Sequence, residues 1–165
     1  MAKLSACGLL LALLLLVGCG TPSGGGGSFG RSDVIHELHL LVLPVPLKSS
    51  QPGAPSGFAV RVFASNRKQA KGMPIRAGTL ELLGYAGALG EAELRAAQPA
   101  RVWSFPATGL AGNATVSSLG VGYQFALSWE GVPPKQNRLT LVARFTPPSG
   151  PAVYTAPSVL PLAGR

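Results

Sequence analysis

Residues 122–130 read GYQFALSWE, and large apolar residues occupy every second position from Tyr123 onward. Successive side chains of a strand point to opposite faces, so this spacing predicts a strand with one buried face. The residues expected on that face are Tyr123, Phe125, Leu127 and Trp129. This stretch is the clearest alternation in the chain, and it favours a β-rich fold.

Similar stretches lie on both sides of it. Runs rich in β-branched, aromatic and leucine residues predict further strands over residues 34–43, 58–64, 79–85, 101–105, 138–145 and 152–160. Turn-forming segments separate these runs, and a glycine-rich loop with Asn113 near its centre follows the run that ends at residue 105. The last run is interrupted by proline, which suits the edge of a sheet.

Residues 87–100 depart from the strand pattern. Residues 91–97 are good helix formers and Pro99 stops them, so one short helix or helical turn is expected. About seven short strands with one short helix predict an all-β fold, an antiparallel β-sandwich. A small barrel is the alternative. The pattern resembles immunoglobulin-like and transthyretin-like sandwiches, although it lacks the Cys–Trp–Cys framework of antibody-type domains.

The first residues do not belong to this domain. A short, positively charged start (Met1-Ala2-Lys3) precedes an almost wholly apolar run over residues 4–17. The run is shorter than the ~20 residues that span a bilayer comfortably. A charged start, a short apolar segment and small residues at its end are typical of a secretory signal peptide. A retained membrane helix is the alternative.

The end of that segment, Leu16-Val17-Gly18-Cys19, resembles the lipobox of bacterial lipoproteins. The resemblance implies that the Cys19 thiol carries a diacylglycerol, that cleavage removes residues 1–18, and that the new amino end is usually acylated as well. Gly20 follows the cysteine where an inner-membrane retention signal would have Asp. The resemblance therefore implies a lipid anchor in the outer membrane, facing the periplasm or the cell surface.

The predicted organisation has three parts: a signal peptide (1–18), a lipidated Cys19 with a Gly/Ser-rich linker (19–33), and a β-sandwich domain (34–165). The linker composition is typical of a flexible chain with a reach of ~20 Å. Cys7 lies within the signal peptide, so a disulfide is not expected in the mature chain. About 130 residues suffice to fold on an apolar core alone.

The chain is strongly basic, with 14 Lys and Arg against 6 Asp and Glu. Four cations fall in one predicted connection, residues 65–76 (SNRKQAKGMPIR): Arg67, Lys68, Lys71 and Arg76. In this basic connection they are candidates for contact with lipid phosphates or with an acidic envelope partner. The other interpretation, which the sequence alone favours, is a solvated hairpin tip whose lysines discourage edge pairing. Nucleic acid is not an expected partner of a secreted lipoprotein.

Candidates for a metal or catalytic site are few. His36 and His39 would point to opposite faces of a strand and could not chelate one ion together, so no metal and no cofactor is expected. Asp33 lies in the linker, and Glu91 and Glu93 lie on an exposed predicted helix. A nucleophile elbow, a phosphate loop and a dinucleotide fingerprint are all missing. The chain is therefore not expected to be an enzyme.

Aromatic residues have two interpretations, a sugar-binding platform or the sandwich core. Their shared facing along two strands favours the core for the whole set: Trp103, Phe105, Tyr123, Phe125, Trp129, Phe145 and Tyr154.

The sequence therefore predicts a lipid-anchored, non-enzymatic envelope lipoprotein that acts as a binding or assembly module. One alternative is a structural lipoprotein of a secretion apparatus, because size, anchor and the runs FAVRVFA and TLELLGY are similar in outline to the transthyretin-like lipoprotein of type VI secretion. Another is a small-ligand carrier or a divergent enzyme.

Overall fold

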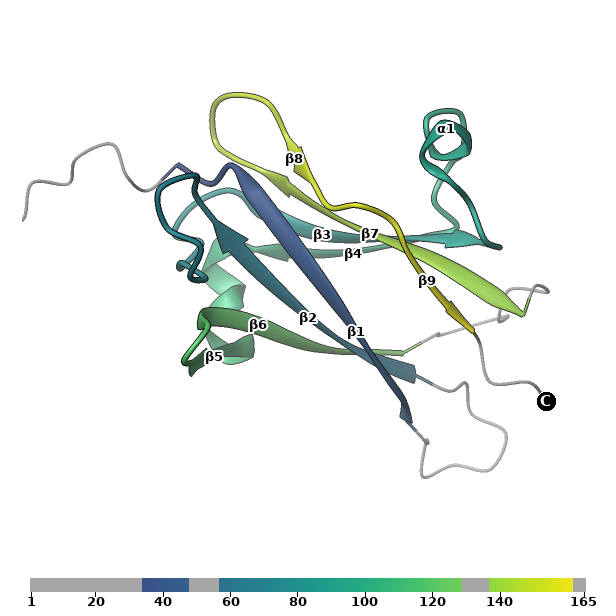
Figure 1. Cartoon of the computed structure of the whole chain (residues 1–165), viewed down its shortest axis with the longest axis horizontal. Helices are drawn as coiled ribbons and strands as arrows, with labels where there is room; N and C mark the ends of the chain where they lie inside the picture. Colours follow the sequence, from purple (N-terminus) through teal and green to yellow (C-terminus); the bar gives the residue numbers. More distant parts are fainter. Residues whose placement is uncertain (1–33, 48–56, 129–136, 162–165) are drawn as a thin grey trace, which may run out of the picture.

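The computed structural model describes residues 34–47, 57–128 and 137–161 of the chain. Two antiparallel sheets are stacked on each other (Figure 1). One has the strand order β1 (Glu37–Leu47), β2 (Gly57–Ser65), β6 (Gly120–Leu127), β5 (Ala114–Ser117). The other has the order β4 (Arg101–Pro106), β3 (Thr79–Ala86), β7 (Arg138–Thr146), β8 (Val153–Tyr154), and β9 (Ser158–Pro161) also pairs with β7.

This arrangement confirms the all-β antiparallel sandwich rather than a barrel. The sheets approach each other where β1 lies close to β7, β8 and β9. On the other side, the 3₁₀ helix η1 (Ala107–Asn113) follows β4 and contacts β6, and its Leu110 is buried in the core. Among the described residues, no helix has the length and apolar character needed to cross a membrane.

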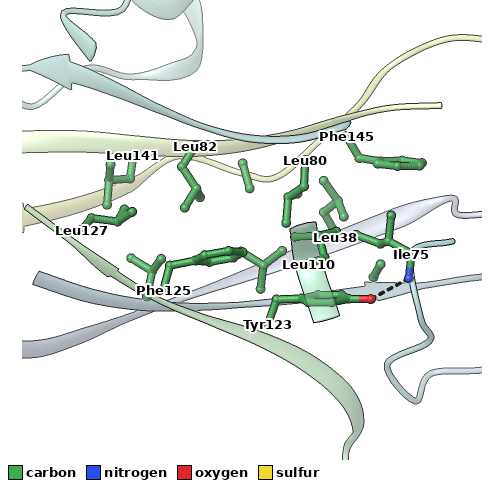
Figure 2. Packing of buried hydrophobic residues seen from close by; sticks show 14 of the residues in the cluster. Leu38, Ile75, Leu80, Leu82, Leu110, Tyr123, Phe125, Leu127, Leu141 and Phe145 are labelled. Atoms are coloured by element: carbon green, nitrogen blue, oxygen red, sulfur yellow. Dashed lines mark hydrogen bonds between the residues drawn. The ribbon is translucent and has the colours of Figure 1, made fainter. Parts of the chain in front are cut away.

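The interior is filled by the alternating apolar faces that the sequence predicts. Phe125 of β6 is 1% exposed and stacks on Phe105 of β4 across the sandwich, with ring centroids 4.2 Å apart. Leu80 and Leu82 of β3 and Leu141 of β7 lie across the sandwich from Phe125 (Figure 2). These inward residues are fully buried, as is Leu139 of β7. The alternation predicted through Tyr123, Phe125 and Leu127 is therefore confirmed for β6.

The aromatic residues divide into two groups. Tyr123, Phe125 and Phe145 are buried, and Trp103 and Phe105 are partly buried against the same core, as expected. Placing Tyr154 in the core was wrong, because its side chain is 55% exposed. Its strand pairs Tyr154 with Arg144, whose side chain points to the outer face of β7. Trp129 lies outside the described residues.

The predicted short helix is present as α1 (Glu91–Leu94). Its first turn is closed by the Glu93 carboxylate, which accepts a 2.7 Å hydrogen bond from the Gly90 N–H. Leu89, Leu94 and Ala97 pack around a small second cluster on the outer face of β3 and β7, formed by Leu83, Tyr85 and Val142. The helix therefore covers the part of this face that is apolar.

Strand boundaries differ from the prediction in three places. The first strand continues to Leu47 through two prolines, after a register shift between Leu43 and Pro46, because an edge strand tolerates the missing N–H. The expected glycine-rich loop contains η1 and the short strand β5. The final run divides into β8 and β9, so the described residues hold nine strands where about seven were expected.

Candidate functional site

The basic connection leaves β2 through a tight turn at Asn66. The Asn66 side chain is buried, and its Oδ1 accepts hydrogen bonds from the N–H groups of Lys68 (2.9 Å) and Gln69 (2.8 Å). The Gln69 N–H also lies 3.2 Å from the Asn66 carbonyl oxygen, to which it donates. A side chain that caps its own turn fixes the local backbone, so Arg67 and Lys68 project from a defined turn.

The same segment then extends the first sheet beside β6. The Gly72 N–H donates to the Leu119 carbonyl at 2.7 Å, and the Val121 N–H donates to the Gly72 carbonyl at 2.9 Å. A Cβ at Gly72 would lie 2.2 Å from the Val121 carbonyl oxygen, which is shorter than any tolerated contact. Glycine is therefore required for the chain to come this close to the β5–β6 hairpin.

The last part of the basic connection is held by the core. The Met73 N–H donates to the Ala64 carbonyl at 2.7 Å, and the Ile75 N–H donates to the Tyr123 hydroxyl at 2.7 Å (Figure 2). Both Met73 and Ile75 are buried in the main apolar cluster. The connection is thus a fixed part of the sandwich, and its cations are exposed on it: Arg67, Lys68, Lys71 and Arg76.

Two other features lie beside these cations. The chain enters the domain at Val34, which is 55% exposed, and the His36 N–H donates to the Ser65 carbonyl at 3.0 Å, next to the Asn66 turn. The tip of the β5–β6 hairpin, which is bonded to Gly72, exposes Leu119 by 60%, and Val116 in β5 is 84% exposed.

These three features share one end of the sandwich, which we call the Val34 end. Figure 1 shows the start of β1, the segment between β2 and β3, and the β5–β6 hairpin together at that end, whereas α1 lies at the opposite end. The Val34 end therefore combines four exposed cations with three exposed apolar side chains. Glu37, whose side chain is 55% exposed, is a carboxylate at the same end.

The two histidines lie near the start of β1, close to oxygen atoms of neighbouring residues. His36 Nδ1 lies 3.1 Å from the Val34 carbonyl oxygen, and His39 Nε2 lies 3.3 Å from Ser65 Oγ and 3.9 Å from Glu37 Oε2. Among the described residues, no three His, Cys, Asp or Glu side chains gather closely enough to hold an ion. Glu91 and Glu93 are exposed on α1, and Glu93 acts as a helix cap.

One polar arrangement could not be identified from the sequence. Ser104, Glu81, Arg144 and Tyr154 form a row of cross-strand neighbours over β4, β3, β7 and β8. Arg144 Nε donates to Glu81 Oε2 at 2.7 Å, and this bond raises the pKa of the guanidinium. The sequence shows that each of these strands has a polar residue at an outward position. Which of these residues are neighbours, however, depends on the register of four strands.

The proposed acylation site, Cys19, and the rest of the lipobox lie outside the described residues. In comparisons by sequence and by structure, no protein-family model, curated protein or solved structure matches this chain.

Proposed function

We propose that this chain is a lipid-anchored lipoprotein of the bacterial cell envelope, held in the outer membrane through Cys19. The observation that carries the proposal is the sequence Leu16-Val17-Gly18-Cys19 at the end of a short apolar segment, followed by a Gly/Ser-rich linker. The folded domain supports it, because its first described residue, Val34, is exposed and the main apolar core is built from residues 35–160. A linker can therefore enter the domain without crossing its interior.

The β-sandwich acts, in this proposal, as a binding or assembly module without catalytic activity. The interior between the sheets is occupied by tightly packed apolar side chains, with Phe125, Leu80 and Leu141 almost fully buried. Such an interior leaves the surface as the place where partners bind, and it disfavours a carrier that holds a small ligand between the sheets. The partners we propose are the membrane, through the anchor, and a further envelope component that contacts the surface of the domain.

Metabolic labelling with an alkyne-tagged fatty acid tests the anchor. Cys19→Ser should abolish labelling and leave the precursor uncleaved, because the hydroxyl of serine is not the thiol that receives the lipid. Cys7→Ser is the matched control, since it removes the other cysteine of the chain and should leave labelling unchanged. Continued labelling of Cys19→Ser would refute the proposed acylation site.

A further inference from the structure

We propose that the Val34 end is a membrane-docking surface that binds an anionic phospholipid bilayer and fixes the orientation of the domain on it. This inference rests on the proposed lipid anchor and specifies what the domain does next to the membrane. The occupant is a bilayer that contains anionic headgroups, and the surface consists of the basic connection, the β5–β6 hairpin tip and Val34.

The first argument is the chemical composition of the surface. The cations Arg67, Lys68 and Lys71 lie within five residues, and Leu119 is joined to Gly72 of the same segment by a backbone hydrogen bond. Cations bind lipid phosphates, and exposed apolar side chains next to them can enter the boundary between headgroups and acyl chains. Neither group alone is unusual on a protein surface, but the backbone contacts hold both at one end.

The second argument is that this surface is rigid before it meets a membrane. The side chain of Asn66 caps the turn. Gly72 is hydrogen-bonded to the β5–β6 hairpin through both its N–H and its carbonyl oxygen, and the Ile75 N–H is hydrogen-bonded to the Tyr123 hydroxyl. Because the backbone that carries the cations is already ordered, docking does not have to order it.

The third argument is the position of the linker. The predicted linker enters the domain at Val34, and the start of β1 is bonded to Ser65, directly before the basic turn. An anchor at Cys19 therefore keeps this end, rather than the α1 end, close to the bilayer. Each cation near an anionic surface strengthens binding on the order of five-fold, which is weak for a free domain. The short linker raises the effective concentration of the surface to the millimolar range, where weak docking becomes populated.

Charge is distributed along the molecule in agreement with this orientation. The Val34 end carries four cations and one carboxylate, Glu37, whereas two exposed carboxylates, Glu91 and Glu93, lie on α1 at the opposite end. The opposite end also carries Arg95 and Arg138, both exposed, which provide a matched control pair of cations.

The test uses the mature lipidated protein in vesicles of neutral phosphatidylcholine, with or without anionic phosphatidylglycerol. Because the thiol of Cys19 carries lipid, a cysteine introduced at Ser118 is the free thiol for an environment-sensitive fluorophore. Ser118 lies in the hairpin tip, and its replacement leaves Val116 and Leu119 in place. Ala92→Cys on α1 is the control position.

We expect the fluorophore at residue 118 to shift to shorter wavelength and to be quenched by lipid-attached quenchers when phosphatidylglycerol is present. High salt should reverse the shift, because the headgroup contacts are screened. Arg67→Gln with Lys68→Gln should weaken docking roughly 25-fold, whereas Arg95→Gln with Arg138→Gln should leave it near the wild-type value. The fluorophore at residue 92 should not respond. Equal thermal unfolding of the two double variants would show that both remain folded.

Three results would overturn the proposal. In the first, the emission of the fluorophore at residue 118 does not change when phosphatidylglycerol is added. In the second, the fluorophore at residue 92 responds as strongly as the one at residue 118. In the third, the two double variants lose docking to the same extent. The first result would instead favour an acidic protein as the partner of these cations. Failure of the anchor is recognised separately, because the protein would then not float with neutral vesicles. Unanchored protein that still floats with anionic vesicles in low salt would support the docking surface and contradict the anchor.

Discussion

The hydroxyl of Tyr123 accepts a 2.7 Å hydrogen bond from the backbone N–H of Ile75, and both residues are buried. Tyr123 is one of the alternating core residues of β6, and Ile75 lies near the end of the basic connection, directly before Arg76. One side chain therefore fills the core and holds the basic connection against the sandwich.

Tyr123→Phe tests this relationship. The ring remains, but the Ile75 N–H is left buried without its partner, which costs about 1–3 kcal/mol of the free energy of unfolding. Hydrogen exchange at the Ile75 amide should accelerate as well. Tyr154→Phe is the control, because Tyr154 is 55% exposed and removing its hydroxyl leaves no buried backbone N–H without a partner, so the loss of stability should be small. Wild-type stability and exchange in Tyr123→Phe would contradict the assigned role.

Truncating the central core residue should be far more damaging. Phe125 is 1% exposed and stacks on Phe105, so Phe125→Ala removes a ring from a packed interior and should lower stability by about 3–5 kcal/mol. Val116→Ala, at a position that is 84% exposed, should change stability by less than about 0.5 kcal/mol. Urea denaturation measures both, and equal effects of the two substitutions would mean that β6 does not face the core.

The ion pair between Glu81 and Arg144 is expected to contribute modestly to the free energy of unfolding. The Glu81 side chain is 16% exposed and that of Arg144 is 34% exposed, so solvent screens part of the attraction. A double-mutant cycle with Glu81→Gln and Arg144→Gln should give a coupling of about 1 kcal/mol that decreases in high salt. A coupling near zero, or one that salt leaves unchanged, would argue against an ion pair between these strands.

Tyr85 makes stability depend on alkaline pH. Burial raises the pKa of its phenol above the usual value, Arg144 partly offsets this, and Tyr154 adds to it. Because the folded state favours the neutral phenol, its contribution is fully present below about pH 10 and is lost as the pH rises through the pKa of the folded state. Urea unfolding across that range should show a shallower decline for Tyr85→Phe. If the stability of the wild type and that of Tyr85→Phe decreased in parallel with rising pH, Tyr85 would not be the origin of the pH dependence.

The strands that the sequence predicted best are those with one fully buried face. The alternation through Tyr123 and Phe125, and again from Leu139 to Phe145, is a local pattern that burial preserves. Boundaries that depend on tertiary context were less predictable. The first strand passes two prolines because it lies at a sheet edge. Tyr154 is exposed because it shares the outer face of the sheet with Arg144, on the short strand β8 beside β7.

The candidate site was predictable as a set of cations but not as a surface. Residues 67–76 show their charge in the sequence, whereas the bond of Gly72 to Leu119 and that of Ile75 to Tyr123 join segments about 50 residues apart. No local pattern encodes such pairings. The proximity of the basic connection to Val34 likewise follows from the pairing of β1 with β2.

Intact-mass spectrometry of the protein extracted from its native membrane tests the central claim most directly. We predict a chain that begins at Cys19 and carries the added mass of a diacylglycerol, with or without a further acyl group on the amino end. A product that retains residues 1–18 and shows no acyl mass at Cys19 would contradict both the anchor and the location that we propose.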